Sequence, residues 1–263
     1  MKICLIYIII LCSICSFSQE NNFSFSLIKT ELIDADEFIG YDSFGYAYYT
    51  KGSVFNKQNE RELFQYKNVA LGKIKRVDIL NPLKIVLFYE NFNTVVLLDN
   101  QLNETQKINF SENQTPIVAS AIGLAAQNKL WVFNNLTQQL ALFDLTKNNF
   151  STLATPFSKT IKFYHSDYNY FYWVDSSNEA YYCDLFGRIT SLETIPKADA
   201  VYFISDYQFM YALDNQLYWV DLKKNLYLPI TLNEKTFKSF SYKEQILTIF
   251  TEREIRTFKI QLP

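Results

Sequence analysis

The stretch Gln208–Asp221, QFMYALDNQLYWVD, contains two short apolar runs separated by two polar residues. The runs at 208–213 and 216–221 have the length and the aromatic content of β-strands. Asp214 and Asn215, which stand between the runs, tolerate the backbone of a tight turn. The stretch therefore predicts a β-hairpin.

The same hairpin pattern recurs along the chain. It is found at 84–89 with 94–99, 129–133 with 139–144, 170–174 with 180–184, and 245–250 with 254–259. The second run of each pair ends next to a polar turn residue, and Glu62–Tyr66 fits the same description. Successive runs are about 34 to 45 residues apart, the period of propeller blades, each of which is a four-stranded antiparallel sheet.

Further runs complete the predicted blades. Outer strands are expected at 105–110, 151–155, 190–195 and 227–231, and inner strands at 118–124, 161–165, 201–205 and 237–242. The last blade is one strand short, and we expect Phe25–Leu32 to supply that strand and close the ring. Lys51–Arg61 is polar and is expected to be a projecting loop. The fold class is therefore all-β, a single six-bladed β-propeller; a β-sandwich or two smaller β domains are the alternatives.

The N-terminus predicts export. Met1-Lys2 precedes an apolar run from Ile3 to Ile14, which is too short to favour a membrane-spanning helix. We expect a signal peptide at 1–19 and a single propeller domain at 20–263, and the Ser-x-Ser-Gln exit resembles signal peptides of the Bacteroidota. The alternative is a lipoprotein signal with Cys12 or Cys15 as the lipidated residue, although a bulky residue precedes each of them.

Composition excludes several classes of function. The net charge is −2 and the charges are dispersed, so no basic block predicts nucleic-acid binding. Three of the four cysteines lie in the signal segment, which leaves Cys183 without a partner for an internal disulfide or a cysteine metal cluster. We expect Cys183 to be a buried, inert thiol, and we predict no cofactor and no metal site.

Two stretches resemble known propellers. Tyr170-Phe-Tyr-Trp-Val-Asp175, followed by Tyr181-Tyr-Cys-Asp-Leu-Phe-Gly187, is similar to one repeat of the YWTD-type and NHL-type propellers. That resemblance implies an aromatic pair between blades and an Asp that holds a turn, and no ligand site. Residues 81–99 resemble a stretch of exported, largely uncharacterised propeller-like proteins of the Bacteroidota, which implies a role in the cell envelope.

No catalytic constellation is predicted. His165 is the sole histidine, so a Ser-His-Asp or Cys-His mechanism would have to use it, and we interpret it as a strand-end or core-lining residue. Carboxylates near the inner strands could form a glycosidase pair in the channel, and otherwise they form turns. These carboxylates are Asp34, Asp36, Glu37, Asp42, Asp78, Asp167 and Asp206.

Most aromatic residues should pack between blades, but some fall near strand ends, where side chains can be exposed. These candidates for a partner surface are Phe44, Tyr46, Tyr48, Tyr49, Tyr168 and Tyr207. Our main hypothesis is a non-enzymatic scaffold that binds envelope proteins in the periplasm or peripherally at the outer membrane, as an accessory of secretion or outer-membrane assembly. The alternative is a carbohydrate-binding or carbohydrate-active propeller, which requires carboxylates and aromatics at an open channel.

Overall fold

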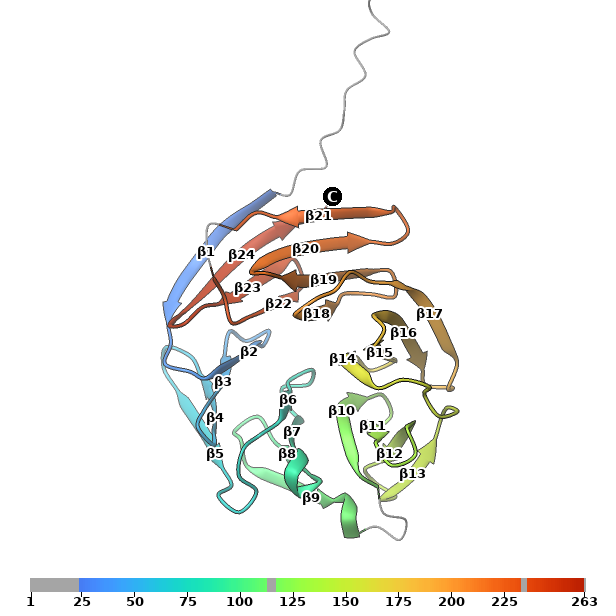
Figure 1. The fold of residues 1–263 in the computed structure, drawn as a ribbon. Helices are drawn as coiled ribbons and strands as arrows, with labels where there is room; N and C mark the ends of the chain where they lie inside the picture. The colour runs from blue at the N-terminus through green and yellow to red at the C-terminus, as the bar shows by residue number, and fades with distance from the viewer. Residues whose placement is uncertain (1–23, 113–116, 233–235, 263) are drawn as a thin grey trace, which may run out of the picture.

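Every predicted hairpin forms, and each belongs to a four-stranded antiparallel sheet. The computed structural model describes residues 24–112, 117–232 and 236–262, so the expected signal peptide lies outside the described residues. Six sheets stand around a common centre as the blades of a propeller, with the first strand of each blade innermost (Figure 1). The prediction of a six-bladed propeller is confirmed.

The blades follow one another in chain order, except that β1 belongs to the last of them. Blade one consists of β2 (Glu37–Tyr41), β3 (Ala47–Lys51), β4 (Val54–Gln58) and β5 (Leu63–Lys67). Blade two consists of β6 (Arg76–Asp78), β7 (Ile85–Tyr89), β8 (Thr94–Leu98) and β9 (Glu104–Asn109), with the 3-10 helices η1 (Glu90–Phe92) and η2 (Phe110–Glu112). Blade three consists of β10 (Ala119–Ala125), β11 (Lys129–Asn134), β12 (Gln139–Asp144) and β13 (Asn149–Thr152).

The second half repeats the arrangement. Blade four consists of β14 (Ile161–Ser166), β15 (Tyr170–Asp175), β16 (Glu179–Asp184) and β17 (Ile189–Thr194). Blade five consists of β18 (Ala200–Phe203), β19 (Gln208–Leu213), β20 (Gln216–Asp221) and β21 (Leu226–Ile230). Blade six consists of β22 (Ser239–Lys243), β23 (Ile246–Phe250), β24 (Glu254–Gln261) and, as its outermost strand, β1 (Ser24–Leu32).

The core is divided among the blade interfaces. One buried apolar cluster fills each of the six junctions between neighbouring blades within the described residues. On β15, Phe171 and Trp173 pack towards blade three, whereas Tyr172 and Val174 pack towards blade five. Because successive side chains of a strand point to opposite faces, strands covered on both faces read as continuous apolar runs. This explains why the central strands were recognisable in the sequence.

The aspartates that follow the third strands hold turns. Asp144 Oδ1 accepts hydrogen bonds from the backbone N–H groups of Thr146 and Lys147, both at 2.9 Å. Asp184 Oδ1 accepts from the N–H groups of Phe186 and Arg188 at 3.0 Å. Such side-chain bonds to nearby backbone fix tight turns. The polar turn residues expected at the ends of these runs therefore do hold turns at Asp144 and Asp184.

Blade one corrects one sequence prediction. Lys51–Arg61 was expected to be a projecting loop, but it contains β4, the third strand of the blade, and Glu62–Tyr66 overlaps the outermost strand β5. The prediction was wrong because β4 buries polar residues. Lys57 Nζ donates a hydrogen bond to the backbone oxygen of Asn100 at 2.7 Å and lies 4.3 Å from the centre of the Tyr46 ring.

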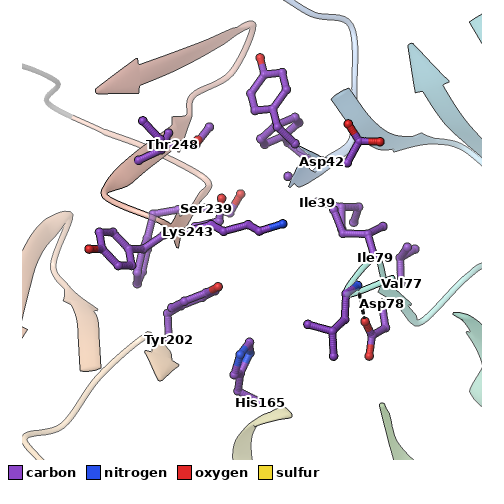
Figure 2. A pocket seen from close by; sticks show the side chains of 18 of the residues that line it. Ile39, Asp42, Val77, Asp78, Ile79, His165, Tyr202, Ser239, Lys243 and Thr248 are labelled. Atoms are coloured by element: carbon purple, nitrogen blue, oxygen red, sulfur yellow. Dashed lines mark hydrogen bonds between the residues drawn. The ribbon is translucent and has the colours of Figure 1, made fainter. Parts of the chain in front are cut away.

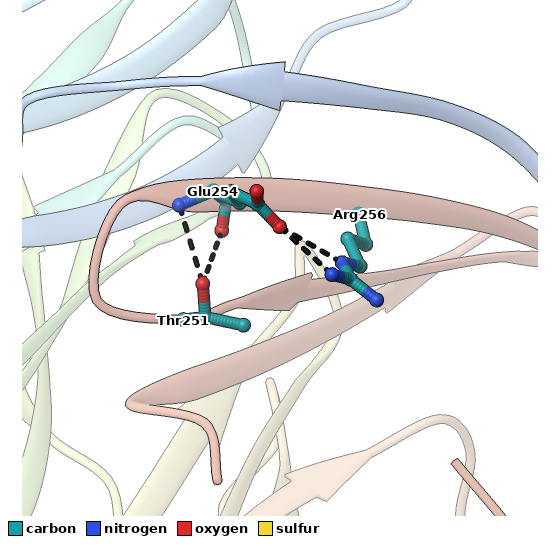
Figure 3. A network of polar contacts seen from close by, with 3 residues as sticks. All are labelled: Thr251, Glu254 and Arg256. Carbon is teal, nitrogen blue, oxygen red and sulfur yellow. Dashed lines mark hydrogen bonds and ion pairs between the residues drawn. The ribbon is translucent and has the colours of Figure 1, made fainter. Parts of the chain in front are cut away.

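The expected closure by the N-terminal segment is confirmed. Strand β1 pairs with β24 from Ser24↔Gln261 to Leu32↔Glu254. The β23–β24 turn that precedes this pairing is fixed by side chains: Thr251 Oγ1 accepts from the Glu254 N–H at 3.2 Å (Figure 3). Glu254 Oε2 in turn accepts two hydrogen bonds from the Arg256 guanidinium, at 3.0 Å and 2.9 Å (Figure 3). These contacts fix the beginning of β24, the strand with which β1 pairs.

Gly187, in the β16–β17 turn, gives a test of the blade spacing. Its φ is +83°, and a Cβ atom there would lie 2.2 Å from the backbone oxygen of Leu153. We expect Gly187→Ala to lower the free energy of unfolding by about 3 kcal/mol, through backbone strain and overpacking. Gly45→Ala is the control, because its φ is +84° but nothing lies within 4 Å of the added atom. Urea denaturation of both variants measures the difference, and equal losses would contradict a close contact between blades three and four.

Candidate functional site in the central channel

The inner strands surround a cavity of about 600 Å³. Strands β2, β6, β14, β18 and β22 contribute its lining, so five of the six blades reach it. Blade three does not line the cavity through its inner strand β10. Instead, β10 packs closely against β14 of blade four, because Gly123 has no side chain and leaves space for that of Ser166. The channel is thus neither aliphatic nor filled by side chains, and polar groups project into it (Figure 2).

Asp78 is anchored in the wall of this cavity. Its Oδ1 accepts a hydrogen bond from the Leu80 N–H at 2.8 Å, and its Oδ2 accepts one from the Leu124 N–H at 2.7 Å. Burial raises the pKa of Asp78, while these bonds and the charge of Arg76 oppose that rise. Both carboxylate oxygens are therefore engaged by the protein, and Asp78 connects β6 to β10.

Arg76 projects from the same strand, two residues before Asp78. Its guanidinium carbon lies 4.5 Å from the centre of the Tyr164 ring, a cation–π geometry. Its Nε is buried and has no hydrogen-bond partner. Within the described residues, no carboxylate oxygen lies within the 4.0 Å ion-pair distance of Arg76. Arg76 therefore lines the cavity without a hydrogen-bonded or ion-paired acceptor within the described residues, although its charge acts on the nearby carboxylates of Glu37 and Asp78.

His165 on β14 and Tyr202 on β18 form a further part of the wall and point into the cavity (Figure 2). Their ring centres are 4.8 Å apart. Burial, followed by the charge of Arg76, lowers the pKa of His165 to about 3, so the imidazole is neutral at pH 7. Burial also raises the pKa of Tyr202 to about 12. Both side chains therefore offer neutral hydrogen-bonding groups. His165, which we interpreted as a strand-end or core-lining residue, stands next to the end of β14 and lines the channel.

The neutral His165 makes stability depend on pH. In the unfolded chain its pKa lies near 6.5, so between about pH 6.5 and pH 3 only the unfolded state takes up this proton. Stability is then lost as the pH falls through that window, by about 1.4 kcal/mol per pH unit from this group. We expect His165→Gln to remove this part of the slope in urea denaturation series between pH 6.5 and 4.5. An unchanged slope would show that the folded protein protonates His165 normally.

The rim of the cavity carries a paired carboxylate and an unpaired amine. Asp42 Oδ1 accepts from the N–H groups of Phe44 and Tyr46 at 2.9 Å and 3.0 Å, and its Oδ2 accepts from the Tyr48 hydroxyl at 2.8 Å. Lys243, at the end of β22, extends its side chain into the cavity (Figure 2). No hydrogen bond or ion pair to Lys243 Nζ is found among the described residues.

The carboxylates singled out in the sequence separate into two groups. Glu37, Asp42 and Asp78 line the cavity, and burial raises the pKa of Glu37. The others form structural contacts: Asp34 pairs with Lys51, Asp36 accepts from the Gly52 N–H at 2.7 Å, and Asp167 accepts from the N–H groups of Asn169 and Tyr170. Asp206 is absent from the cavity lining.

The predicted partner surface is corrected at two positions. Phe44 is 73% exposed and Tyr168 is 38% exposed, and Tyr46 and Tyr207 are partly exposed. Tyr48 and Tyr49, in contrast, are buried. They lie within β3, a strand covered on both faces: the Tyr48 ring stacks with Phe55, and Tyr49 belongs to the cluster between blades one and six. Whether the exposed residues bind a partner stays a prediction.

Sequence reasoning missed Arg76, Tyr164, Tyr202, Ser239 and Lys243 as lining residues. A signal was present, because Arg76 and Asp78 alternate with an apolar residue, as do Ser239, Ser241 and Lys243. On an inner strand, this alternation directs polar side chains towards the channel. Within the described residues, no group of three or more metal-ligating side chains is found, and no helix is long and apolar enough to cross a membrane.

No protein-family model and no curated protein matches the chain. Among solved structures, the selenomethionine form of virginiamycin B lyase from Staphylococcus aureus is similar, with 12% identity and a TM-score of 0.58 over 84% of this chain and 78% of that one. A streptogramin B lyase is similar at 12% identity, with a TM-score of 0.59 over 91% of this chain and 98% of that one. The catalytically inactive H270A variant of the Staphylococcus aureus enzyme, solved with quinupristin, is similar at 11% identity, with a TM-score of 0.57 over 90% of this chain and 99% of that one. At this level of identity, the likeness shows that the chain shares the propeller fold of these proteins.

Proposed function

We propose that this chain is an exported propeller that binds a small, hydroxyl-rich ligand of the carbohydrate class in its central cavity. The observation that carries the proposal is the open cavity of about 600 Å³ with tyrosine, serine and carboxylate side chains in its lining. Ligand pockets of proteins are typically about 300 to 1,000 Å³ and combine apolar surface with a few placed polar groups. A sugar presents the matching chemistry, since its hydroxyl groups alternate with apolar C–H faces that stack on aromatic rings.

The comparisons add one supporting fact. One of the similar propellers, the inactive virginiamycin B lyase variant, was solved with quinupristin, so a propeller of related shape takes a small molecule. The proposal concerns binding and not catalysis. Glycoside hydrolysis uses two carboxyl groups that flank the scissile bond. Asp42 and Asp78 are both engaged by backbone N–H groups, and the other lining carboxylates are Glu37 and Glu244, to which the proposal assigns no catalytic role.

A cavity-filling variant tests the proposal. Ser239 lines the cavity from β22, so Ser239→Trp is expected to occupy the ligand volume (Figure 2). We expect saturation-transfer NMR against a panel of mono- and oligosaccharides to detect at least one ligand with the native protein and none with Ser239→Trp. Ser191→Trp is the control, since Ser191 is exposed on the outermost strand of blade four. Absence of binding across the panel, or equal binding by both variants, would overturn the proposal.

A second candidate, the envelope scaffold, is favoured by a different feature. Neighbouring strands of a blade run in opposite directions. The turn that joins the first strand to the second and the turn that joins the third to the fourth therefore lie on the same face of the ring. Four exposed apolar side chains lie in these turns: Phe44, Leu83, Tyr168 and Phe186. We propose that this face binds a protein partner in the periplasm or at the outer membrane, in keeping with the predicted export and with the resemblance to exported Bacteroidota propellers.

Affinity purification from membranes of the native host tests this candidate. A stoichiometric partner is expected with the native chain and is expected to be lost in the double variant Phe44→Ser, Phe186→Ser. Leu136→Ser is the control, because Leu136 is 65% exposed but lies in a turn between second and third strands, on the opposite face. Recovery of the native protein without a partner, or equal recovery of the partner with the double variant, would contradict the scaffold function.

A further inference from the structure

The charged side chains that line the cavity differ in how many hydrogen bonds they receive or donate within the protein. The carboxylates Asp42 and Asp78 receive hydrogen bonds on both of their oxygens. The cations Arg76 and Lys243 have no hydrogen bond or ion pair within the described residues. Lys243 is exposed, so water can satisfy its amine, whereas the Arg76 Nε is buried. A buried donor without an acceptor costs free energy, and the cost is larger when the group is charged. The cavity is therefore complementary to a ligand that brings an acceptor with a negative charge.

Arg76 is held in position to receive such a group. The guanidinium lies over the Tyr164 ring, with 4.5 Å between the guanidinium carbon and the ring centre. The Tyr164 hydroxyl in turn accepts a hydrogen bond from the Ile122 N–H at 3.3 Å, which fixes the ring against blade three. A planar, oriented guanidinium pairs with a carboxylate through two parallel hydrogen bonds.

The surrounding charges favour a single negative charge on the ligand. Asp78 stands two residues from Arg76 on the same strand, and the charge of Arg76 is also felt by Glu37. Glu37 and Asp78 repel any anion, and the repulsion grows with the charge of the ligand, so a singly charged carboxylate is disfavoured less beside Arg76 than a doubly charged phosphate. Lys243 adds a second positive charge at the rim, where Glu244 also lines the cavity.

We infer that Arg76 binds the carboxylate of the ligand, so that the ligand class narrows to acidic sugars of the uronate type. The inference rests on the proposed binding function of the cavity. The carboxylate contacts Arg76, the hydroxyl groups face Tyr202, His165 and the serines of β22, and the sugar ring occupies the space between the inner strands.

Paired probes test the inference. Dissociation constants for glucuronate and glucose, and for galacturonate and galactose, are measured by titration in saturation-transfer NMR. The native protein is expected to bind the uronate at least tenfold more tightly than the neutral sugar. Arg76→Gln is expected to reduce that preference to about twofold or less while neutral-sugar binding persists. Arg76→Lys, which keeps the charge without the planar fork, is expected to give an intermediate preference.

The controls separate the outcomes. Arg253→Gln, at an exposed arginine absent from the cavity lining, should leave the preference unchanged, and melting temperatures confirm that each variant is folded. Equal binding of acidic and neutral sugars, or a preference that survives Arg76→Gln, overturns the inference and leaves the binding function standing. Tighter binding of glucose 6-phosphate than of glucuronate overturns the carboxylate assignment. Binding of none of the probes overturns the inference and the proposed function together.

Discussion

A chain that begins after Leu32 is expected to lose on the order of 5 kcal/mol of stability, which is comparable with the whole stability of many domains. Strand β1 pairs with β24 over eight pairs of residues, and its loss would expose that strand as an unpaired edge. Strand β1 also contacts blade one, because Lys29 Nζ lies 4.3 Å from the centre of the Tyr41 ring and the Tyr41 hydroxyl donates to Glu31. Its removal therefore weakens the ring on both sides of the closure.

Guanidinium denaturation and gel filtration measure this effect. The truncated chain is expected to unfold at a much lower denaturant concentration and to form aggregates through its open edge. A chain that begins at Phe23, which keeps all of β1, is the control and should behave as the untruncated chain does. If both chains have the same midpoint and remain monomeric, β1 does not close the ring in solution.

Trp131→Ala is expected to lower the free energy of unfolding by about 3–5 kcal/mol, as for other large buried aromatic residues. The indole is completely buried between blades three and four, where its ring centre lies 6.1 Å from that of Phe171. Its Nε1 donates a hydrogen bond to the backbone oxygen of Asp167 at 2.9 Å, so it also connects β11 to the β14–β15 turn. The variant loses both the packing and this connection.

Two further variants are compared with Trp131→Ala. Trp131→Phe keeps an aromatic ring but leaves the Asp167 oxygen without its donor, and we expect a loss of about 1–3 kcal/mol. Phe186→Ala removes a ring that is 93% exposed and should change stability by less than about 0.5 kcal/mol. A loss at Trp131→Ala no greater than at Phe186→Ala would contradict the packing between blades three and four.

Local patterns in the sequence predicted most of the fold. Hairpins such as Gln208–Asp221 were recognisable because both faces of their strands are buried between blades. The closure by Phe25–Leu32 was predictable because one blade lacked a strand and one segment lacked a partner. Blade one was misjudged where Lys57 is buried, since its acceptor, the oxygen of Asn100, lies in another blade and leaves no local signal. Tyr48 and Tyr49 were misplaced because neighbouring blades cover both faces of β3: Tyr48 packs towards blade two and Tyr49 towards blade six.

The candidate site was predictable only in part. Carboxylates near the inner strands were singled out, and Glu37, Asp42 and Asp78 do line the cavity. Whether a channel is open, however, depends on the sizes of all the side chains that meet there from different blades. The contact of Asp78 with the Leu124 N–H joins blades two and three, and the contact of Arg76 with Tyr164 joins blades two and four. No spacing within one blade could reveal these contacts.

The proton resonances of the His165 imidazole give the most direct test of the cavity as the binding site. His165 is the sole histidine, so untagged protein gives one unambiguous ring signal from a side chain that points into the cavity (Figure 2). Addition of a sugar that binds should shift this signal, and the shift should saturate at the dissociation constant found by saturation transfer. Saturable binding that leaves the His165 signal unmoved would place the ligand elsewhere and contradict a binding site in the central channel.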